Sequence, residues 1–253
     1  MARNPVQHVP SRQNLRNTLG LAREFGFIEF NTIDQVEWWD DFIGDTIHGG
    51  YFTATNGTGA DALAISATGI SGEATIKNGT ADDAYSGFGT GLEWYGQLNC
   101  AMAVRLKTDD IAATKIEVGF TDATDDGGAC NDLDGATFTA TDCAVWAFDT
   151  DDSTDNWKLA STPDGGTTDT VTDTGIAPAA DTYETLIIAL EDTAAHFYRL
   201  DSNGYQTYRA SHTTGPSKDV ALTPWVFTQT REGSDEKTVT VDFIRVWQRR
   251  TVS

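Results

Sequence analysis

Segments in which apolar and polar residues alternate with a period of two constrain this fold more than any other feature of the sequence. The clearest segment places an apolar residue at every second position: Leu98, Cys100, Met102, Val104 and Leu106. Such a period puts all five side chains on one face of a β-strand. Further segments follow at 116–120, 145–148, 182–190, 195–200 and 239–247, the last of them rich in β-branched and aromatic residues.

Turn-forming dipeptides separate these segments. Asn-Gly or Asp-Gly pairs occur at 56–57, 78–79, 126–127, 164–165 and 203–204, among other positions. No long helical pattern lies between the strands, so we expect antiparallel sheets. The 253 residues fit one large all-β domain or at most two small ones. The sequence therefore predicts an antiparallel two-sheet sandwich of jelly-roll type over residues 36–253.

Residues 1–35 differ from the rest, because they are polar and show no clean period. Composition alone is typical of a disordered tail. The first 30 residues nevertheless have a net charge of +2, whereas the other 223 have −23. We interpret 1–35 as an extended N-terminal arm that anchors the chain to a partner, with folding back onto its own domain as the alternative. Its partner-binding candidates are the arginines: Arg3, Arg12, Arg16 and Arg23.

The body of the chain is strongly acidic. The whole chain has a net charge of −21, and residues 107–156 alone hold −11. This balance argues against a nucleic-acid partner, because phosphate binding needs a basic surface. The apolar runs are also shorter than a membrane span requires. Three cysteines are too few for a disulfide scaffold, and a bridge between Cys130 and Cys143 cannot be deduced from sequence.

Calcium is the one metal that the acidic loops suggest. Asp149, Asp151 and Asp155 have the odd spacing that opens an EF-hand loop. The sixth position is Thr154 where glycine is needed, and the twelfth is Ala160 where glutamate is needed. The EF-hand interpretation fails, and an irregular oxygen-ligand site remains a weak hypothesis beside a solvated loop that keeps the chain soluble.

Several motifs resemble the concanavalin A-like lectin/glucanase jelly rolls. Val241–Gln248 (VDFIRVWQ) looks like their closing strand, and Trp38–Phe42 (WWDDF) resembles their opening strand. The segment Glu184–Gly204 is similar to one of their hairpins. Lys115–Asp122 and Ala144–Asp152 resemble jelly-roll proteins of tailed-phage structural gene clusters. The resemblance covers residues 36–249 and leaves the arm without a counterpart.

The resemblance implies catalysis only if a Glu-x-Asp-x-x-Glu motif is present, as in laminarinase-type relatives. No glutamate in this chain is followed by aspartate two residues on. The nearest candidate is Glu117, but Asp122 lies an odd number of residues away and would face the other side of a strand. We therefore predict that the chain is not an enzyme; a glycoside hydrolase or lyase is the least favoured hypothesis.

Sugar binding is another property that the fold implies. It requires an exposed aromatic platform, and the alternative for each aromatic residue is burial in the core. Because adjacent residues of a strand face opposite sides, at most one of Trp38 and Trp39 can face the core. The candidates are the seven tryptophans and one tyrosine: Trp38, Trp39, Trp94, Tyr95, Trp146, Trp157, Trp225 and Trp247.

The leading functional hypothesis from sequence is a virion structural protein on the surface of a phage particle. It would decorate or cement the capsid as a homotrimer, with the arm bound to the major capsid protein or to other virion proteins. The alternative is a carbohydrate-binding jelly-roll module of a tail or fibre protein, which would bind a glycan.

Overall fold

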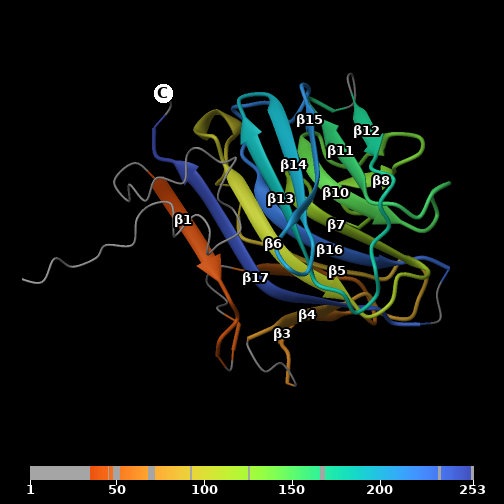
Figure 1. Cartoon of the computed structure of the whole chain (residues 1–253). Coiled ribbons are helices and arrows are strands. Elements are labelled where there is room, and N and C mark those ends of the chain that lie inside the picture. The colour runs from red at the N-terminus through yellow and green to blue at the C-terminus, as the bar shows by residue number, and fades with distance from the viewer. Residues whose placement is uncertain are drawn as a thin grey trace, which may run out of the picture.

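The structure, a computed structural model, is built almost entirely of strands (Figure 1). It describes residues 35–251 apart from 45, 48–51, 68–71, 92, 125, 166–168 and 233–234. These residues contain seventeen strands and one short 3-10 helix, η1 (Gly96–Leu98). No helix among them is long and apolar enough to cross a membrane. The predicted N-terminal arm, with Arg3, Arg12, Arg16 and Arg23, lies outside the described residues.

The larger sheet has eight strands, and β1 is added to it by pairing with β17 (Figure 1). All its pairs are antiparallel. Strand β1 spans Gln35–Asp40. The order of the other seven strands, from one edge to the other, is β15 (Gln206–His212), β14 (Ala194–Leu200), β13 (Glu184–Glu191), β6 (Ala101–Thr108), β17 (Thr238–Arg249), β4 (Ala74–Lys77) and β3 (Asp61–Ile65).

The second sheet has seven strands and is also antiparallel throughout. Its order is β12 (Thr170–Asp173), β11 (Lys158–Thr162), β10 (Cys143–Asp149), β7 (Thr114–Thr121), β16 (Thr223–Thr230), β5 (Tyr85–Gly89) and β2 (Thr53–Asn56). A separate two-stranded ribbon consists of β8 (Cys130–Asp132) and β9 (Thr137–Phe138).

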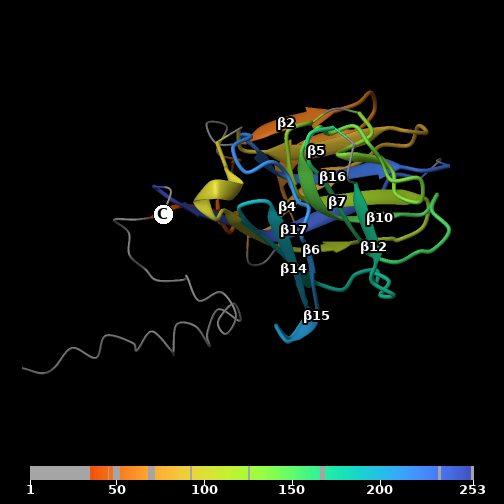
Figure 2. The same ribbon diagram turned by 90° about the horizontal axis from the view of Figure 1, so that it is seen from above.

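The two large sheets pack face to face, and Figure 2 shows them as two layers. The core between them takes alternate residues from the central strands. Met102 and Val104 of β6 face Val118 of β7 and Trp146 of β10 within one buried cluster. The indole N–H of Trp146 donates to the carbonyl of Ile187 across the gap, at 3.3 Å. Burial of this apolar surface is the main stabilisation of such a sandwich.

The strands predicted from the period-two pattern are confirmed, with small shifts at their ends. Leu98 lies in η1 rather than in β6, which begins at Ala101. The hairpin between β13 and β14 turns through Asp192 and Thr193, and Asp192 adopts a left-handed φ of 51°. The long strand β17 contains a register shift between Val241 and Phe243, so its alternation is interrupted there.

The outer face of the seven-stranded sheet is partly covered by the chain itself. The segment 126–142, which includes β8 and β9, forms a second apolar cluster with β10 and β11. Val145 and Ala147 contribute to it from β10, together with Cys130 and Cys143. All three cysteines are free and buried. Part of this sheet is therefore buried on both faces.

Candidate functional site

Glu117, the sequence candidate nearest to a catalytic carboxylate, lies on the covered face of β7. Its side chain is fully buried, as is that of Lys115. The Lys115 ammonium lies 3.1 Å from Glu117 Oε1 and donates to the carbonyls of Gly127, at 2.6 Å, and Cys130. The backbone N–H groups of Ala129 and Cys130 donate to Glu117 at 2.6 and 3.0 Å. The carboxylate therefore holds the covering segment in place.

Gly128 shows how closely the segment approaches this carboxylate. Its φ is +73°, and a Cβ at this position would lie 2.4 Å from Glu117 Oε2. Only glycine adopts this backbone conformation without strain and leaves room for the carboxylate.

Glu184 is a second buried carboxylate. The indole N–H of Trp157 donates to its Oε1 at 3.0 Å, and Arg199 forms an ion pair with its Oε2. Burial raises the pKa of Glu184, although the charge of Arg199 opposes this shift. Both oxygens are bound to side chains, as expected for a structural ion pair inside a sandwich.

The three calcium candidates do not come together as a set of ligands for one metal ion. Asp149 is buried, and Arg231 donates to its two oxygens at 2.9 and 2.6 Å. Asp151 lies 3.5 Å from the same guanidinium, whereas Asp155 is exposed in the following loop. Among the described residues, no group of three or more His, Cys, Asp or Glu side chains is arranged to hold a metal ion. The acidic hollow of about 600 Å³ beside Arg231 is thus organised around an arginine.

The aromatic candidates separate sharply by burial. Trp94, Trp146, Trp157, Trp225 and Trp247 are all at most 5% exposed. Tyr95 is half-buried. The prediction that Trp38 and Trp39 face opposite sides is confirmed, because Trp38 packs edge-on against Phe52 with ring centroids 4.9 Å apart. Trp39 is 60% exposed, the only one of the seven tryptophans with an open indole.

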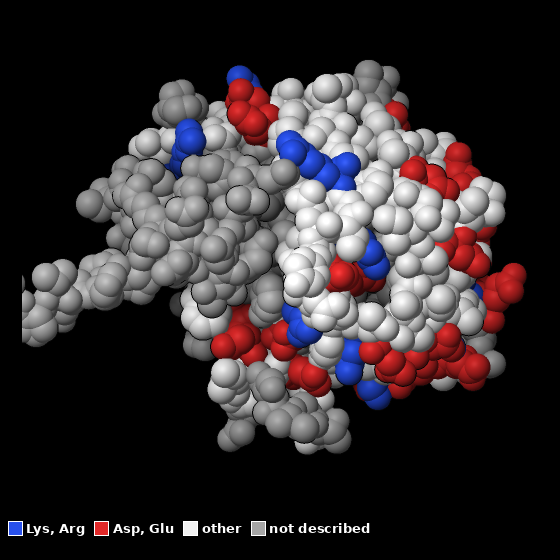
Figure 3. All heavy atoms as spheres, in the orientation of Figure 1, with Lys and Arg blue, Asp and Glu red and all other residues white. Residues whose placement is uncertain are grey.

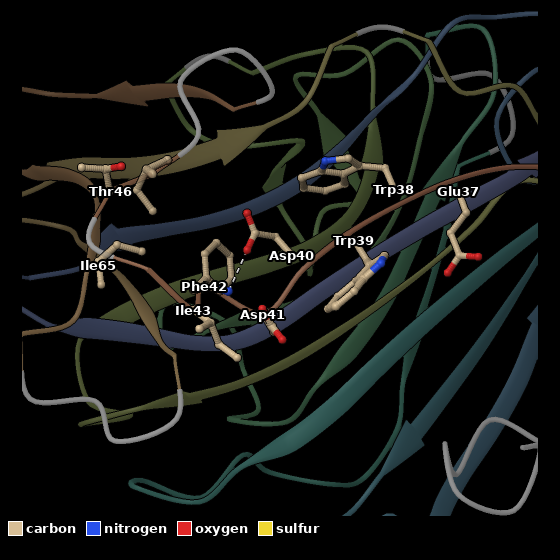
Figure 4. Close-up of a pocket in the computed structure, with 10 residues that line it drawn as sticks. Glu37, Trp38, Trp39, Asp40, Asp41, Phe42, Ile43, Thr46 and Ile65 are labelled. Atoms are coloured by element: carbon tan, nitrogen blue, oxygen red, sulfur yellow. Dashed lines mark hydrogen bonds between the residues drawn. The ribbon is translucent and has the colours of Figure 1, made fainter.

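The open indole stands at a hollow of about 460 Å³ beside the end of β1 (Figure 4). In Figure 4, Trp39, Asp41 and Ile43 point to one side of the chain, and Trp38 and Asp40 point to the other. Ile43 is 75% exposed. The residues that line the hollow are Glu37, Trp38, Trp39, Asp40, Asp41, Phe42, Ile43, Thr46, Ile47 and Ile65.

Local contacts fix the backbone around this hollow. Asp40 Oδ1 accepts the backbone N–H of Phe42 at 2.7 Å, and Phe42 adopts a left-handed φ of 55°. The Phe42 ring stacks on Phe52, with centroids 5.8 Å apart, which anchors the turn to the core. Gly72, with a φ of +82°, packs so closely that a Cβ there would lie 2.3 Å from the carbonyl oxygen of Asp41. The hollow therefore depends on the local contact between Asp40 and Phe42 and on the more distant contacts with Phe52 and Gly72.

An exposed indole beside carboxylates can bind a sugar. The apolar C–H face of a pyranose ring stacks on an aromatic ring, while carboxylates accept hydrogen bonds from its hydroxyl groups. Sequence reasoning placed Trp39 among eight aromatic candidates but did not identify Asp41 or Ile43 as neighbours. The Trp-Trp-Asp-Asp run was visible, yet only the turn at Phe42 and the contact with Gly72 place these side chains around one hollow.

No protein-family model and no curated protein sequence matches this chain. Solved structures do match it. A protein of unknown function from Shewanella oneidensis MR-1 aligns over 99% of this chain and 98% of its own, with 13% identity and a TM-score of 0.62. A peanut lectin aligns over 86% of this chain and 99% of its own, with 10% identity and a TM-score of 0.57. The chain has the concanavalin A-like jelly-roll fold.

The jelly-roll neighbours include different kinds of protein. The CBM2 module of the evolved Dit of Lactobacillus casei BL23 phage J-1 aligns over 86% of this chain and 97% of its own, with 11% identity and a TM-score of 0.55. Glucanases and glycoside hydrolase family proteins share the fold as well. The predicted jelly-roll sandwich is confirmed, and at these identities the likeness establishes the fold alone.

Proposed function

We propose that the described domain is a non-catalytic carbohydrate-binding module of a phage particle. The observation that carries this proposal is the open indole of Trp39 at a hollow lined by carboxylates. The fold is shared with lectins and with the CBM2 module of a phage Dit, which supports both parts of the proposal.

The contacts of the two buried glutamates support a non-catalytic role. A glycosidase of the retaining type needs two carboxyl groups about 5–5.5 Å apart that reach the substrate. Glu117 is bound to a lysine and two backbone amides beneath the segment 126–142, and Glu184 to an arginine and an indole. Neither carboxylate is free to act on a sugar without unfolding part of the domain.

A glycan array followed by titration calorimetry tests the proposal. We expect saturable binding of a carbohydrate that Trp39→Ala reduces at least tenfold, because the substitution removes the stacking surface. Tyr205→Ala is the matched control, since Tyr205 is 72% exposed but does not line the hollow. Absence of any glycan binding, or equal loss in both variants, would contradict the proposal. Hydrolysis of a bound glycan would contradict the non-catalytic role.

The uneven charge of the chain favours a second candidate, a capsid decoration protein anchored by its N-terminal arm. Four arginines lie within the first 23 residues, whereas the chain as a whole has a net charge of −21. On the face seen in Figure 3, the acidic side chains of the described residues gather mainly near the edges. Arginines of an arm can form bidentate pairs with carboxylates of shell subunits.

Capsid binding by the full chain tests this second candidate. Replacing Arg3, Arg12, Arg16 and Arg23 with serine should weaken binding to undecorated capsids and make the remaining binding less dependent on salt. Light scattering of the free protein would measure the expected trimer. Capsid binding that is unchanged by the four substitutions would contradict an anchoring role for the arm.

A further inference from the structure

We propose that the sugar bound at the Trp39 hollow carries a free ammonium group, as 2-amino-2-deoxyhexoses do; this rests on the proposed function. The lining of the hollow contains three carboxylates and no basic side chain: Glu37, Asp40 and Asp41. Anionic glycans would meet like charges there, whereas a cationic sugar would meet opposite ones.

The three carboxylates differ in what they can offer a ligand. Glu37 Oε1 lies 2.6 Å from Arg245 Nε, so its charge is neutralised by an arginine. Asp40 uses Oδ1 to accept the N–H of Phe42. Asp41 has no ion pair with a described residue and lies half-buried at the rim. Because Asp40 points away from the Trp39 indole, the negative charge available to a ligand on that indole is concentrated at Asp41 (Figure 4).

Asp41 is placed to act together with Trp39. The two residues are separated by one position, which corresponds to roughly 6–7 Å along an extended chain. In Figure 4 both side chains point to the same side of the chain. A hexose ring stacked on the indole would thus bring a ring substituent to Asp41. An ammonium substituent would form a charge-assisted hydrogen bond, which is stronger than the bond from a hydroxyl group.

Competition between two oligosaccharides of equal length tests the inference. The probes are glucosamine tetramer and N-acetylglucosamine tetramer, titrated into the full chain at a pH where the free amine is protonated. We expect the glucosamine tetramer to bind about three- to tenfold more tightly, a moderate factor because the pair is solvent-exposed. Asp41→Asn should remove most of that difference, because it should weaken binding of the glucosamine tetramer more than binding of the acetylated tetramer.

Asp219→Asn is the matched control, because Asp219 is an exposed carboxylate that does not line the hollow. Asp219→Asn should leave the preference for the glucosamine tetramer unchanged. An equal effect of Asp219→Asn and Asp41→Asn would overturn the inference, because the preference would then arise from the overall negative charge of the protein. Equal affinity for the two tetramers would overturn the inference while glycan binding stands. An arginine-rich peptide that displaces the glucosamine tetramer at equal concentration would overturn it in favour of a protein ligand.

Failure of the proposed function is a different result. It would appear as no binding of either tetramer or of any arrayed glycan, or as binding that Trp39→Ala does not change. Circular dichroism of each variant would establish that the sandwich is intact.

Discussion

Glu117 lies on the outer face of β7 and Asp41 directly follows the end of β1, and the surroundings of these two carboxylates differ. Glu117 is fully buried under the segment 126–142 with a lysine and two backbone amides as partners. Asp41 lies at an open hollow beside an indole that is 60% exposed. The difference shows that position on a sheet does not decide whether an acidic group can meet a ligand. Coverage by a distant segment decides it.

The largest expected effect on stability comes from removing one charge of the buried pair Lys115 and Glu117. Glu117→Gln should lower the free energy of unfolding by about 3–5 kcal/mol, because it leaves the Lys115 ammonium buried without a counter-charge. Urea denaturation measures this loss. The double variant Lys115→Met/Glu117→Leu should recover much of it, since no unpaired charge remains. Asp41→Asn is the control on the open side and should change stability by less than about 0.5 kcal/mol. Equal effects of Glu117→Gln and Asp41→Asn would refute the comparison.

A buried and an exposed histidine should likewise differ in how they change the stability of the protein at low pH. His212 is buried between the sheet edges, with Ser161 Oγ 2.7 Å from Nδ1 and Thr172 Oγ1 3.0 Å from Nε2. Burial lowers the pKa of His212 from 6.5 to about 4. The stabilising contribution of neutral His212 is therefore complete above pH 6.5 and decreases as the pH falls toward 4, because the unfolded chain binds the proton first.

Urea midpoints at pH 7 and pH 4.5 measure this effect. The loss of unfolding free energy attributable to His212 should be about 2 kcal/mol over that range. His212→Asn should remove this part of the pH dependence, whereas His196→Gln on the more exposed strand surface should not. An identical pH dependence in the wild type and in the His212→Asn variant would show that His212 is not sealed from solvent.

The smallest expected change in stability is that of Trp39→Ala, and its neighbour Trp38 in β1 provides the contrast. Trp38→Ala should lower the free energy of unfolding by about 2–3 kcal/mol, because Trp38 packs against the core at Phe52. Trp39→Ala should change it by less than about 0.5 kcal/mol, since its indole is mostly exposed. Thermal denaturation and glycan titration of both variants measure the two properties. A large loss of stability in Trp39→Ala would mean that this indole is structural.

Much of the architecture was predictable from the chain. The period-two segments predicted β6, β7, β10, β13, β14 and the C-terminal strand. The adjacency of Trp38 and Trp39 in an expected strand predicted that they face opposite sides. The absence of a Glu-x-Asp-x-x-Glu motif could also be established from the sequence alone. These properties are local, because alternation along a strand fixes the face of each side chain whatever packs against it.

Only the tertiary structure decided which of these faces are open. Glu117 is sealed by backbone amides 12 and 13 residues away, and Asp149 is paired with an arginine 82 residues away. The hollow at Trp39 depends on Gly72, which packs against the backbone of Asp41. Burial and charge pairing arise from contacts between segments far apart in sequence, so the periodicity that predicts a strand cannot tell a covered carboxylate from an exposed one.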